Sequence, residues 1–321
     1  MKVGVLTSGG DSPGMNAAIR AIVRFGVLHD CQIVGIHGGY QGILDKEYEE
    51  LSSRTVAHLI HRGGTCLTTG RSEEFKTEEG LRRAAELLDS IDVDGLVAIG
   101  GDGTMRGLYH LQEHWGGRAV GLPGTIDNDV YGTDYSIGFD TAVNNALDAI
   151  DKIRDTAESY SRVFLVEVMG RHAGAIALHV GIASGASAIL LPETPTDLDK
   201  IAARIIEGRK AGKSSSIVIV AEGDEAGNAS AIGEKLSERI GERCRVSVLG
   251  YIQRGGNPTR MDRILASRLG ARAIECLKAG IDGVMLGEID GEIAETPFKE
   301  TWTKEKKLDQ WMLELIAPLS T

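Results

Sequence analysis

Residues 95–104 read Gly-Leu-Val-Ala-Ile-Gly-Gly-Asp-Gly-Thr, an apolar run that ends in a glycine-rich turn with one carboxylate. The run predicts a short buried strand over Gly95–Ile99, a tight turn and then a helix. Similar apolar runs predict strands at Val3–Thr7, Ile33–His37, Ala119–Leu122, Val163–Val168, Ala188–Leu191, Ile217–Ala221 and Val246–Leu249. Helix-like segments between them include Met15–Leu28, Glu78–Ser90, Phe139–Ala157 and Leu198–Gly212. This alternation predicts an α/β protein with mainly parallel sheets and with ligands at the carboxyl ends of the strands.

Length and charge restrict the class of protein further. At 321 residues the chain exceeds the usual size of a single core, which favours two domains. Tyr131–Ile137 and Leu249–Gly256 are the expected crossings between them. The net charge of −11 argues against a basic nucleic-acid footprint and against a polybasic membrane patch. Binding of an anionic substrate would therefore depend on local clusters of arginine.

The cysteines and the apolar runs predict the cellular compartment of the protein. The four cysteines contain no C-x-x-C pair, which argues against a zinc site or a disulfide framework and fits a reducing cytosol. The sequence enters a predicted strand at its first residues, and no apolar run is long enough to span a bilayer. We expect a cytoplasmic protein without a signal peptide and without nucleic-acid or membrane partners.

Two glycine-rich turns carry candidate phosphate-binding groups. In residues 7–16, TSGGDSPGMN, two glycines turn the chain between a predicted strand and a helix, which exposes backbone N–H groups to an anion. In residues 99–104, IGGDGT, the glycines let the backbone approach phosphates, and the carboxylate of Asp102 suits Mg²⁺. Taken alone, the first segment is equally consistent with a simple tight turn, and Asp102 with an ordinary helix cap.

A third turn carries two carboxylates. Residues 122–129, LPGTIDND, place Asp127 and Asp129 two positions apart beside Thr125. An alcohol that attacks a phosphoryl group needs a carboxylate within hydrogen-bond reach to accept its proton. The neighbouring carboxylate would adjust the pKa of that base or help to hold a metal ion. The same run is also consistent with an Asx-rich turn.

Arginines follow several of the predicted strands in this acidic chain. Arg171 lies in MGRH, residues 169–172, and Arg254 lies in YIQRGG, residues 251–256. Arg162 and Arg245 are two further candidates. The planar guanidinium group matches the oxygens of a phosphate, so the cluster favours binding of a phosphorylated ligand.

With these turns identified, the chain resembles the bacterial-type ATP-dependent 6-phosphofructokinase family from Met1 to about Pro297. The resemblance rests on motifs in the order of the family: LTSGGDSPGMNAAIR, RGGT, GGDGT, PGTIDND, GTDYSIGFDTA, VEVMGR, GYIQRGG and DRILASR. It implies transfer of the γ-phosphoryl group of ATP to the 1-hydroxyl of fructose 6-phosphate, as in glycolysis. Mg²⁺ would be the cofactor and ATP the co-substrate.

The resemblance also implies a role for each matching residue. The ATP site would be lined by Gly10, Tyr40, Arg71, Ser72, Gly101, Gly103 and Thr104, with Asp102 as the Mg²⁺ ligand. Asp127 would be the general base, with Thr125 and Asp129 beside it, and Arg171 would stabilise the transferring phosphoryl group. The sugar would be contacted by Met169, Gly170 and Glu222, and its 6-phosphate would be held by Arg162, Arg245, Tyr251 and Arg254.

The assembly implied by the resemblance is a homotetramer in which Arg162 and Arg245 reach the site of a neighbouring subunit. The implied fold has two Rossmann-like α/β domains with the active site in the cleft between them. Residues 1–137 and 251–300 would form the larger, ATP-binding domain, and residues 138–250 and 301–321 the smaller, fructose-6-phosphate-binding domain. At Tyr251 the best-studied bacterial members carry histidine, so tyrosine keeps a donor here but loses the option of a positive charge.

The effector pocket of the family is only partly matched. The matching or neighbouring cationic positions are Arg20, Arg24, Arg54, Arg154 and Lys213. One arginine of the family falls at Ser53, with Arg54 next to it, the effector glutamate falls at Ser187, and one lysine becomes Ala211. These losses predict weak activation by ADP, weak inhibition by phosphoenolpyruvate and near-hyperbolic saturation with fructose 6-phosphate, unless Arg54 and Lys210 rebuild the pocket.

Other classes of protein fit the sequence less well. A pyrophosphate-dependent phosphofructokinase usually has a carboxylate after GGD and a lysine before TIDND, where this chain has Gly103 and Gly124. NAD kinases and lipid kinases share GGDGT but lack the TIDND and MGR motifs. A dinucleotide-dependent dehydrogenase would need G-x-G-x-x-G between a strand and a helix, with an acidic residue about 20 positions further on. No predicted strand of this chain is followed by that pattern. A non-catalytic regulatory subunit would be expected to have lost Asp102 or Asp127, and both are present.

Overall fold

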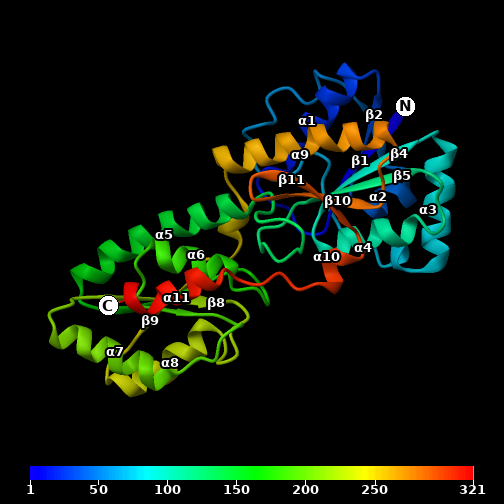
Figure 1. Cartoon of the computed structure of the whole chain (residues 1–321). Helices are drawn as coiled ribbons and strands as arrows, with labels where there is room; N and C mark the ends of the chain where they lie inside the picture. Colours follow the sequence, from blue (N-terminus) through cyan, green and yellow to red (C-terminus); the bar gives the residue numbers. More distant parts are fainter. Residues whose placement is uncertain (321) are drawn as a thin grey trace. The chain divides into compact units, whose positions relative to one another are not determined.

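The computed structural model describes residues 1–320, and the chain divides into two compact units (Figure 1). The larger unit comprises Met1–Ile126, Val130–Thr141 and Arg254–Lys306. The smaller unit comprises Asp127–Asp129, Ala142–Gln253 and residues 307–320. Each unit has its own sheet, so the predicted α/β fold class with two sheet-containing parts is confirmed.

The larger unit is built on a seven-stranded sheet in the order β11-β10-β5-β4-β1-β2-β3. Its strands are β1 (Lys2–Ser8), β2 (Gln32–Ile36), β3 (Tyr48–Leu51), β4 (Gly95–Gly100), β5 (Arg118–Pro123), β10 (Val284–Ile289) and β11 (Glu292–Pro297). The five central strands are parallel, whereas β3 and β11 run antiparallel at the two edges. The sequence prediction missed β3, β10 and β11. β3 (YEEL) is mostly exposed and half of its residues are glutamates, and β11 (EIAETP) is half exposed and carries two glutamates, so both lack the apolar run expected of a central strand.

Helices cover both faces of this sheet because its central strands are apolar on both sides. On one face α1 (Met15–Leu28) and α9 (Arg260–Ala279) pack against each other and over Val3, Val5 and Val97 (Figure 1). The opposite face, with Leu6 and Leu96, is covered by the remaining helices of this layer. These are α2 (Tyr40–Asp45), α3 (Glu78–Ser90) and α4 (Asp102–Leu111). A 3₁₀ turn, η1 (Glu74–Lys76), precedes α3, and the short α10 (Glu300–Thr303) packs on α4.

The smaller unit has a four-stranded parallel sheet in the order β7-β8-β6-β9. Its strands are β6 (Val163–Val168), β7 (Ala188–Leu190), β8 (Ser216–Ala221) and β9 (Arg245–Val248), followed by the 3₁₀ turn η2 (Gly250–Arg254). Its helices are α5 (Phe139–Ser159), α6 (Ala175–Ala183), α7 (Leu198–Lys210), α8 (Ala229–Ile240) and α11 (Gln310–Leu319). The first three residues of α5 belong to the larger unit. Within residues 1–320, no helix is long and apolar enough to cross a bilayer.

Candidate active site

Strand register in the larger unit brings three predicted site loops to one edge of the sheet. Ser8 at the end of β1 pairs with Gly100 at the end of β4, and Gly100 pairs in turn with Pro123 at the end of β5. The turns that follow these residues contain the motifs SGGD, GGDGT and PGTID. The carboxyl ends of parallel strands are the usual ligand-binding edge of an α/β sheet, so these motifs lie where a ligand is expected.

The GGDGT turn is fixed by close packing of the backbone. A Cβ on Gly100 would lie 2.2 Å from Oγ1 of Thr104 and 2.4 Å from the carbonyl oxygen of Ser8, so a side chain at this position would collide with its neighbours. The hydroxyl of Thr104 donates a hydrogen bond to that same carbonyl oxygen at 3.2 Å. Helix α4 then begins at Asp102, whose side chain is exposed, and a Cβ on Gly103 would have no atom within 4 Å. The helix N-terminus therefore offers free space beside a carboxylate.

The metal-binding capacity of this turn rests on Asp102. Residues 1–320 contain no cluster of three or more histidine, cysteine or acidic side chains that would hold a metal ion by themselves. Mg²⁺ commonly binds through one or two carboxylates together with waters and substrate phosphates. One exposed carboxylate at a helix N-terminus that can also receive phosphate fits that mode of binding.

The SGGD turn of the larger unit is in contact with Arg254. Nη1 of Arg254 donates a hydrogen bond to the carbonyl oxygen of Asp11 at 3.0 Å. A Cβ on Gly10 would lie 2.7 Å from the same Nη1, so only glycine leaves the guanidinium group in place. The structure thus brings together Gly10, predicted from the ATP side, and Arg254, predicted from the sugar side.

Tyr40, predicted to line the ATP site, is buried against the start of α4. Its side chain is buried, its ring stacks on Phe75 with the centroids 4.1 Å apart, and its hydroxyl donates to the carbonyl oxygen of Thr104 at 2.6 Å. Burial raises the pKa of Tyr40 well above its usual value. The residue therefore links α2 to the first turn of α4.

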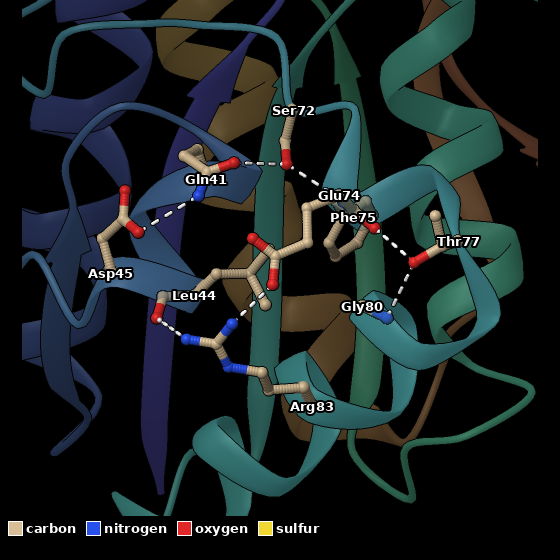
Figure 2. Close-up of polar contacts among 9 residues, drawn as sticks. All are labelled: Gln41, Leu44, Asp45, Ser72, Glu74, Phe75, Thr77, Gly80 and Arg83. Atoms are coloured by element: carbon tan, nitrogen blue, oxygen red, sulfur yellow. Dashed lines mark hydrogen bonds and ion pairs between the residues drawn. The ribbon is translucent and has the colours of Figure 1, made fainter.

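Ser72 is also largely buried and is held in a chain of hydrogen bonds (Figure 2). Its hydroxyl donates to Oε1 of Gln41 at 2.6 Å and accepts from the backbone N–H of Phe75 at 3.0 Å. Figure 2 also shows Nε2 of Gln41 donating to Asp45. Arg71, next to Ser72, is exposed and lines a cavity of about 400 Å³ together with Gln41, which leaves its guanidinium group accessible to a ligand.

The TIDND loop distinguishes its two carboxylates. Asp127 is 3 % exposed, whereas Asp129 is exposed. In the smaller unit, Nε of Arg171 lies 3.7 Å from Oδ2 of Asp127, and the backbone N–H of Arg171 donates to Glu222 at 3.1 Å. Arg171 has φ of +52°, a left-handed conformation that is uncommon outside glycine and that often marks a functional site. Asp127, Arg171 and Glu222 are thereby gathered in one place.

The predicted sugar-binding residues of the smaller unit lie at opposite ends of its parallel strands. Met169, Gly170 and Arg171 follow the carboxyl end of β6, and Glu222 follows the carboxyl end of β8. Arg162 precedes β6, and Arg245 begins β9 and pairs with Phe164 near the amino end of β6. β6 has six residues, so its two ends are separated by about 20 Å. Arg162 and Arg245 are therefore distant from Met169–Arg171 within one chain.

The predicted effector residues of the smaller unit form a cluster of positive charge. Arg154 donates a hydrogen bond to the carbonyl oxygen of Ser184, and Arg204 donates to that of Ser187 at 3.4 Å. Burial, Arg154 and Arg204 together lower the pKa of Lys213. Arg204 was missed because nothing in the sequence of an amphipathic helix indicates which surface arginine faces another element. In the larger unit, burial and the neighbouring Arg24 lower the pKa of Arg20.

The fold and these loops are those of an α/β phosphotransferase. A model of the phosphofructokinase family matches residues 2–277, and the chain belongs to this family. It is 54 % identical over 319 residues to ATP-dependent 6-phosphofructokinase 1 of Thermus thermophilus and 50 % identical to the ATP-dependent 6-phosphofructokinase of Bacillus subtilis, each match covering 99 % of both chains. It is also similar to phosphofructokinase from Saccharomyces cerevisiae (TM-score 0.88, 35 % identity). That match covers 94 % of this chain but only 45 % of the longer yeast chain.

Proposed function

We propose that this protein transfers the γ-phosphoryl group of ATP to the 1-hydroxyl of fructose 6-phosphate, giving fructose 1,6-bisphosphate and ADP. The observation that carries the proposal is that Asp127, on the PGTIDND loop, is buried and lies close to Arg171. The chain also matches, over nearly its whole length, relatives named as ATP-dependent 6-phosphofructokinases. The cysteines include no C-x-x-C pair and are free, which fits a reducing, cytoplasmic setting.

Each group has a distinct task in the proposed reaction. The Asp127 carboxylate accepts the proton of the 1-hydroxyl as its oxygen attacks the γ-phosphorus, and the bond from phosphorus to the bridging oxygen of ADP breaks. Arg171 donates hydrogen bonds to the phosphoryl oxygens, where negative charge is spread in the transition state. Asp102 would hold Mg²⁺, and the bound ion would supply positive charge to neutralise the phosphates of the nucleotide. The N–H groups at the start of α4 orient the same phosphates.

ATP is favoured over pyrophosphate as the donor. The space around Gly103 admits a bulky donor at the start of α4. A Cβ on Gly124 would lie 2.8 Å from Ile99 and 3.1 Å from Met15, so this position has no room for the lysine of the pyrophosphate type. A non-catalytic regulatory subunit is disfavoured because Asp102 is exposed and Asp127 already faces Arg171.

The proposed activity predicts that Asp127→Ser destroys turnover while leaving binding nearly intact. Loss of the general base lowers kcat by roughly 10²- to 10⁴-fold with a small change in KM, because the carboxylate acts in the transition state. Fructose 1,6-bisphosphate formation is measured with fructose 6-phosphate, Mg²⁺ and ATP, and again with pyrophosphate. Asp148→Ser, on the exposed face of α5, is the control and keeps wild-type kcat.

Two results would contradict this account. A wild-type enzyme that uses pyrophosphate faster than ATP would identify the alternative donor. An Asp127→Ser variant that keeps more than about a third of wild-type kcat would remove Asp127 from the role of general base.

We also propose that the active enzyme is a homotetramer in which neighbouring subunits share sites. Arg162 directly precedes β6 and Arg245 begins β9, so both lie at the amino ends of their strands, whereas Arg171 follows the carboxyl end of β6. They therefore suit the 6-phosphate of a sugar bound by another subunit. β9 is an edge strand with exposed Val246 and Val248, and exposed apolar edges of this kind are common association surfaces. Tyr251, which is 83 % exposed, follows the same strand.

Arg245→Ala is predicted to raise KM for fructose 6-phosphate about 10- to 150-fold, because a charge-assisted contact to phosphate is lost, with little effect on KM for ATP. Arg243→Ala, at an exposed neighbouring position, is the control and changes neither constant. Mixing inactive Asp127→Ser subunits with Arg245→Ala subunits restores part of the activity, because some hybrid sites then contain both residues. Equal rises in both KM values, or no complementation in mixed tetramers, would place Arg245 elsewhere.

For regulation we propose a weakened effector site. Its cationic part is retained in Arg154 and Lys213, and Arg204 adds a third charge beside Ser187. The family's glutamate and one lysine are replaced by Ser187 and Ala211, and each missing charge-assisted contact costs roughly 1.5–3 kcal/mol of binding. The effector would then bind weakly, so its influence on the enzyme would be small.

Saturation with fructose 6-phosphate is accordingly predicted to be near-hyperbolic, with little change on adding ADP or phosphoenolpyruvate. Rates are measured across fructose 6-phosphate concentrations without effector and with each effector at a saturating level for regulated relatives. A Hill coefficient above about 2 that falls towards 1 with ADP would show a working effector site, since such cooperativity requires strongly coupled subunits. Arg54 and Lys210 would then be the residues to replace first.

A further inference from the structure

Asp262 is a buried carboxylate that none of the proposed ligand contacts uses. It lies in the first turn of α9, and its side chain is 1 % exposed. Oδ1 accepts a hydrogen bond from the backbone N–H of Gly138 at 2.7 Å. Oδ2 accepts from the backbone N–H of Thr141 at 2.8 Å and from the hydroxyl of Thr141 at 2.5 Å. A carboxylate on one helix therefore caps the beginning of another helix, α5.

The capping is reciprocal. Thr259 is the N-cap of α9, accepting from the backbone N–H of Asp262, and its hydroxyl donates to Oδ2 of Asp140 in the first turn of α5 at 2.5 Å. The backbone N–H of Thr259 donates to the hydroxyl oxygen of Thr141 at 2.9 Å. The two helix N-termini thus supply donors and acceptors to each other, and both termini favour negative charge nearby.

A pKa of about 6 makes the carboxylate the main form of Asp262 at neutral pH. Burial raises the pKa of its carboxyl to about 6, against the hydrogen bonds from Thr141 and Gly138, which lower it. Three donors therefore face a carboxylate under ordinary assay conditions. An asparagine here would present an NH₂ group to at least one N–H donor, and that donor would be left buried without an acceptor.

The residues that Asp262 holds end the loop that carries Asp127. This loop leaves β5 after Pro123 and returns at Ile137, whose backbone N–H donates to the carbonyl oxygen of Pro123 at 2.8 Å. The hydroxyl of Ser136 donates to the carbonyl oxygen of Thr125 at 2.6 Å. Gly138, the next residue, is the one bound to Oδ1 of Asp262. The loop is closed at its base, and the closing end is tied to α9.

The SGGDSPG turn packs on the same anchor. A Cβ on Gly138 would lie 2.5 Å from Cβ of Ser12, and a Cβ on Gly14 would lie 2.7 Å from Ile137 and 3.5 Å from Cβ of Asp262. Gly14 and Gly138 have φ of +113° and +103°, conformations that only glycine adopts readily. The close approach means that a shift of Gly138 would also displace the turn that precedes α1.

We propose that Asp262 is a positioning residue for phosphoryl transfer, because it fixes Gly138 and Thr141 and thereby the loop that presents Asp127. This inference rests on the proposed function, since it assumes that Asp127 is the general base. A residue that only stabilised α5 would lower the midpoint of unfolding and leave kcat of the folded enzyme unchanged. A positioning residue lowers kcat at temperatures where the protein is fully folded.

The test replaces Asp262 by asparagine in the full-length enzyme and measures kcat, both KM values, the thermal midpoint and amide hydrogen exchange. We expect kcat to fall roughly 10- to 100-fold, because small displacements of catalytic groups have effects of this size, with KM values within about threefold. Exchange of residues 124–138 becomes faster. Asp309→Asn is the matched control: Asp309 accepts two backbone N–H bonds at the start of α11, which carries no proposed site residue. It keeps kcat and normal exchange in residues 124–138.

Thr141→Val is a second variant, because it removes the hydroxyl that donates to Asp262 and accepts from the backbone N–H of Thr259, and it keeps the backbone N–H of residue 141 that donates to Asp262. It is expected to lower kcat in the same direction but by less, and it decides the question if Asp262→Asn does not fold. The proposal is overturned if folded variants keep kcat within about twofold or leave exchange of residues 124–138 unchanged. A wild-type enzyme without ATP-dependent activity would instead refute the proposed function, and the exchange measurement would still report whether Asp262 anchors the loop.

Discussion

The parallel register of β1, β4 and β5 is the constraint on which the rest of the larger unit depends. It aligns Ser8, Gly100 and Pro123, so that the three loops after them begin side by side. Gly100 permits this alignment, because any side chain there would collide with the carbonyl oxygen of Ser8. The hydroxyl of Thr104 then binds the GGDGT turn to the same oxygen, and the hydroxyl of Tyr40 donates to the carbonyl oxygen of Thr104. The exposed Asp102 is thereby fixed at the start of α4.

In the smaller unit, parallel strands likewise bring site residues together at their carboxyl ends. Arg171 and Glu222 follow the carboxyl ends of adjacent parallel strands, and the hydrogen bond between them brings Arg171 near Asp127. Arg162 and Arg245 lie at the amino ends of β6 and β9, about a strand length away. In the proposed tetramer, a neighbouring subunit would supply the Arg162 and Arg245 side chains, which lie far from Arg171 within one chain.

The sequence predicted the apolar elements well, because a buried strand or amphipathic helix leaves a periodic pattern. The range Met15–Leu28 was predicted to the residue, and the eight predicted strands agree with the observed ones within one or two positions, but the parallel strand β10 (Val284–Ile289) was missed. The sequence did not predict β11, whose two glutamates and C-terminal proline resemble a loop. It also did not predict the burial of Tyr40 or the hydrogen bond between Arg254 and Asp11. These features depend on partners distant in the sequence. Asp262 belongs to the motif DRILASR, but a sequence motif does not show which backbone N–H groups donate hydrogen bonds to a carboxylate.

The roles of the individual site residues are tested most directly by a crystal structure with fructose 6-phosphate, Mg²⁺ and a non-hydrolysable ATP analogue. The account predicts a carboxylate oxygen of Asp127 about 2.6–3.2 Å from the 1-hydroxyl oxygen of the sugar, which is the reach of a general base. It also predicts Asp102 on Mg²⁺ and Arg245 of a neighbouring subunit on the 6-phosphate. A sugar whose 1-hydroxyl lies beyond hydrogen-bond reach of Asp127, with another side chain in its place, would contradict the account.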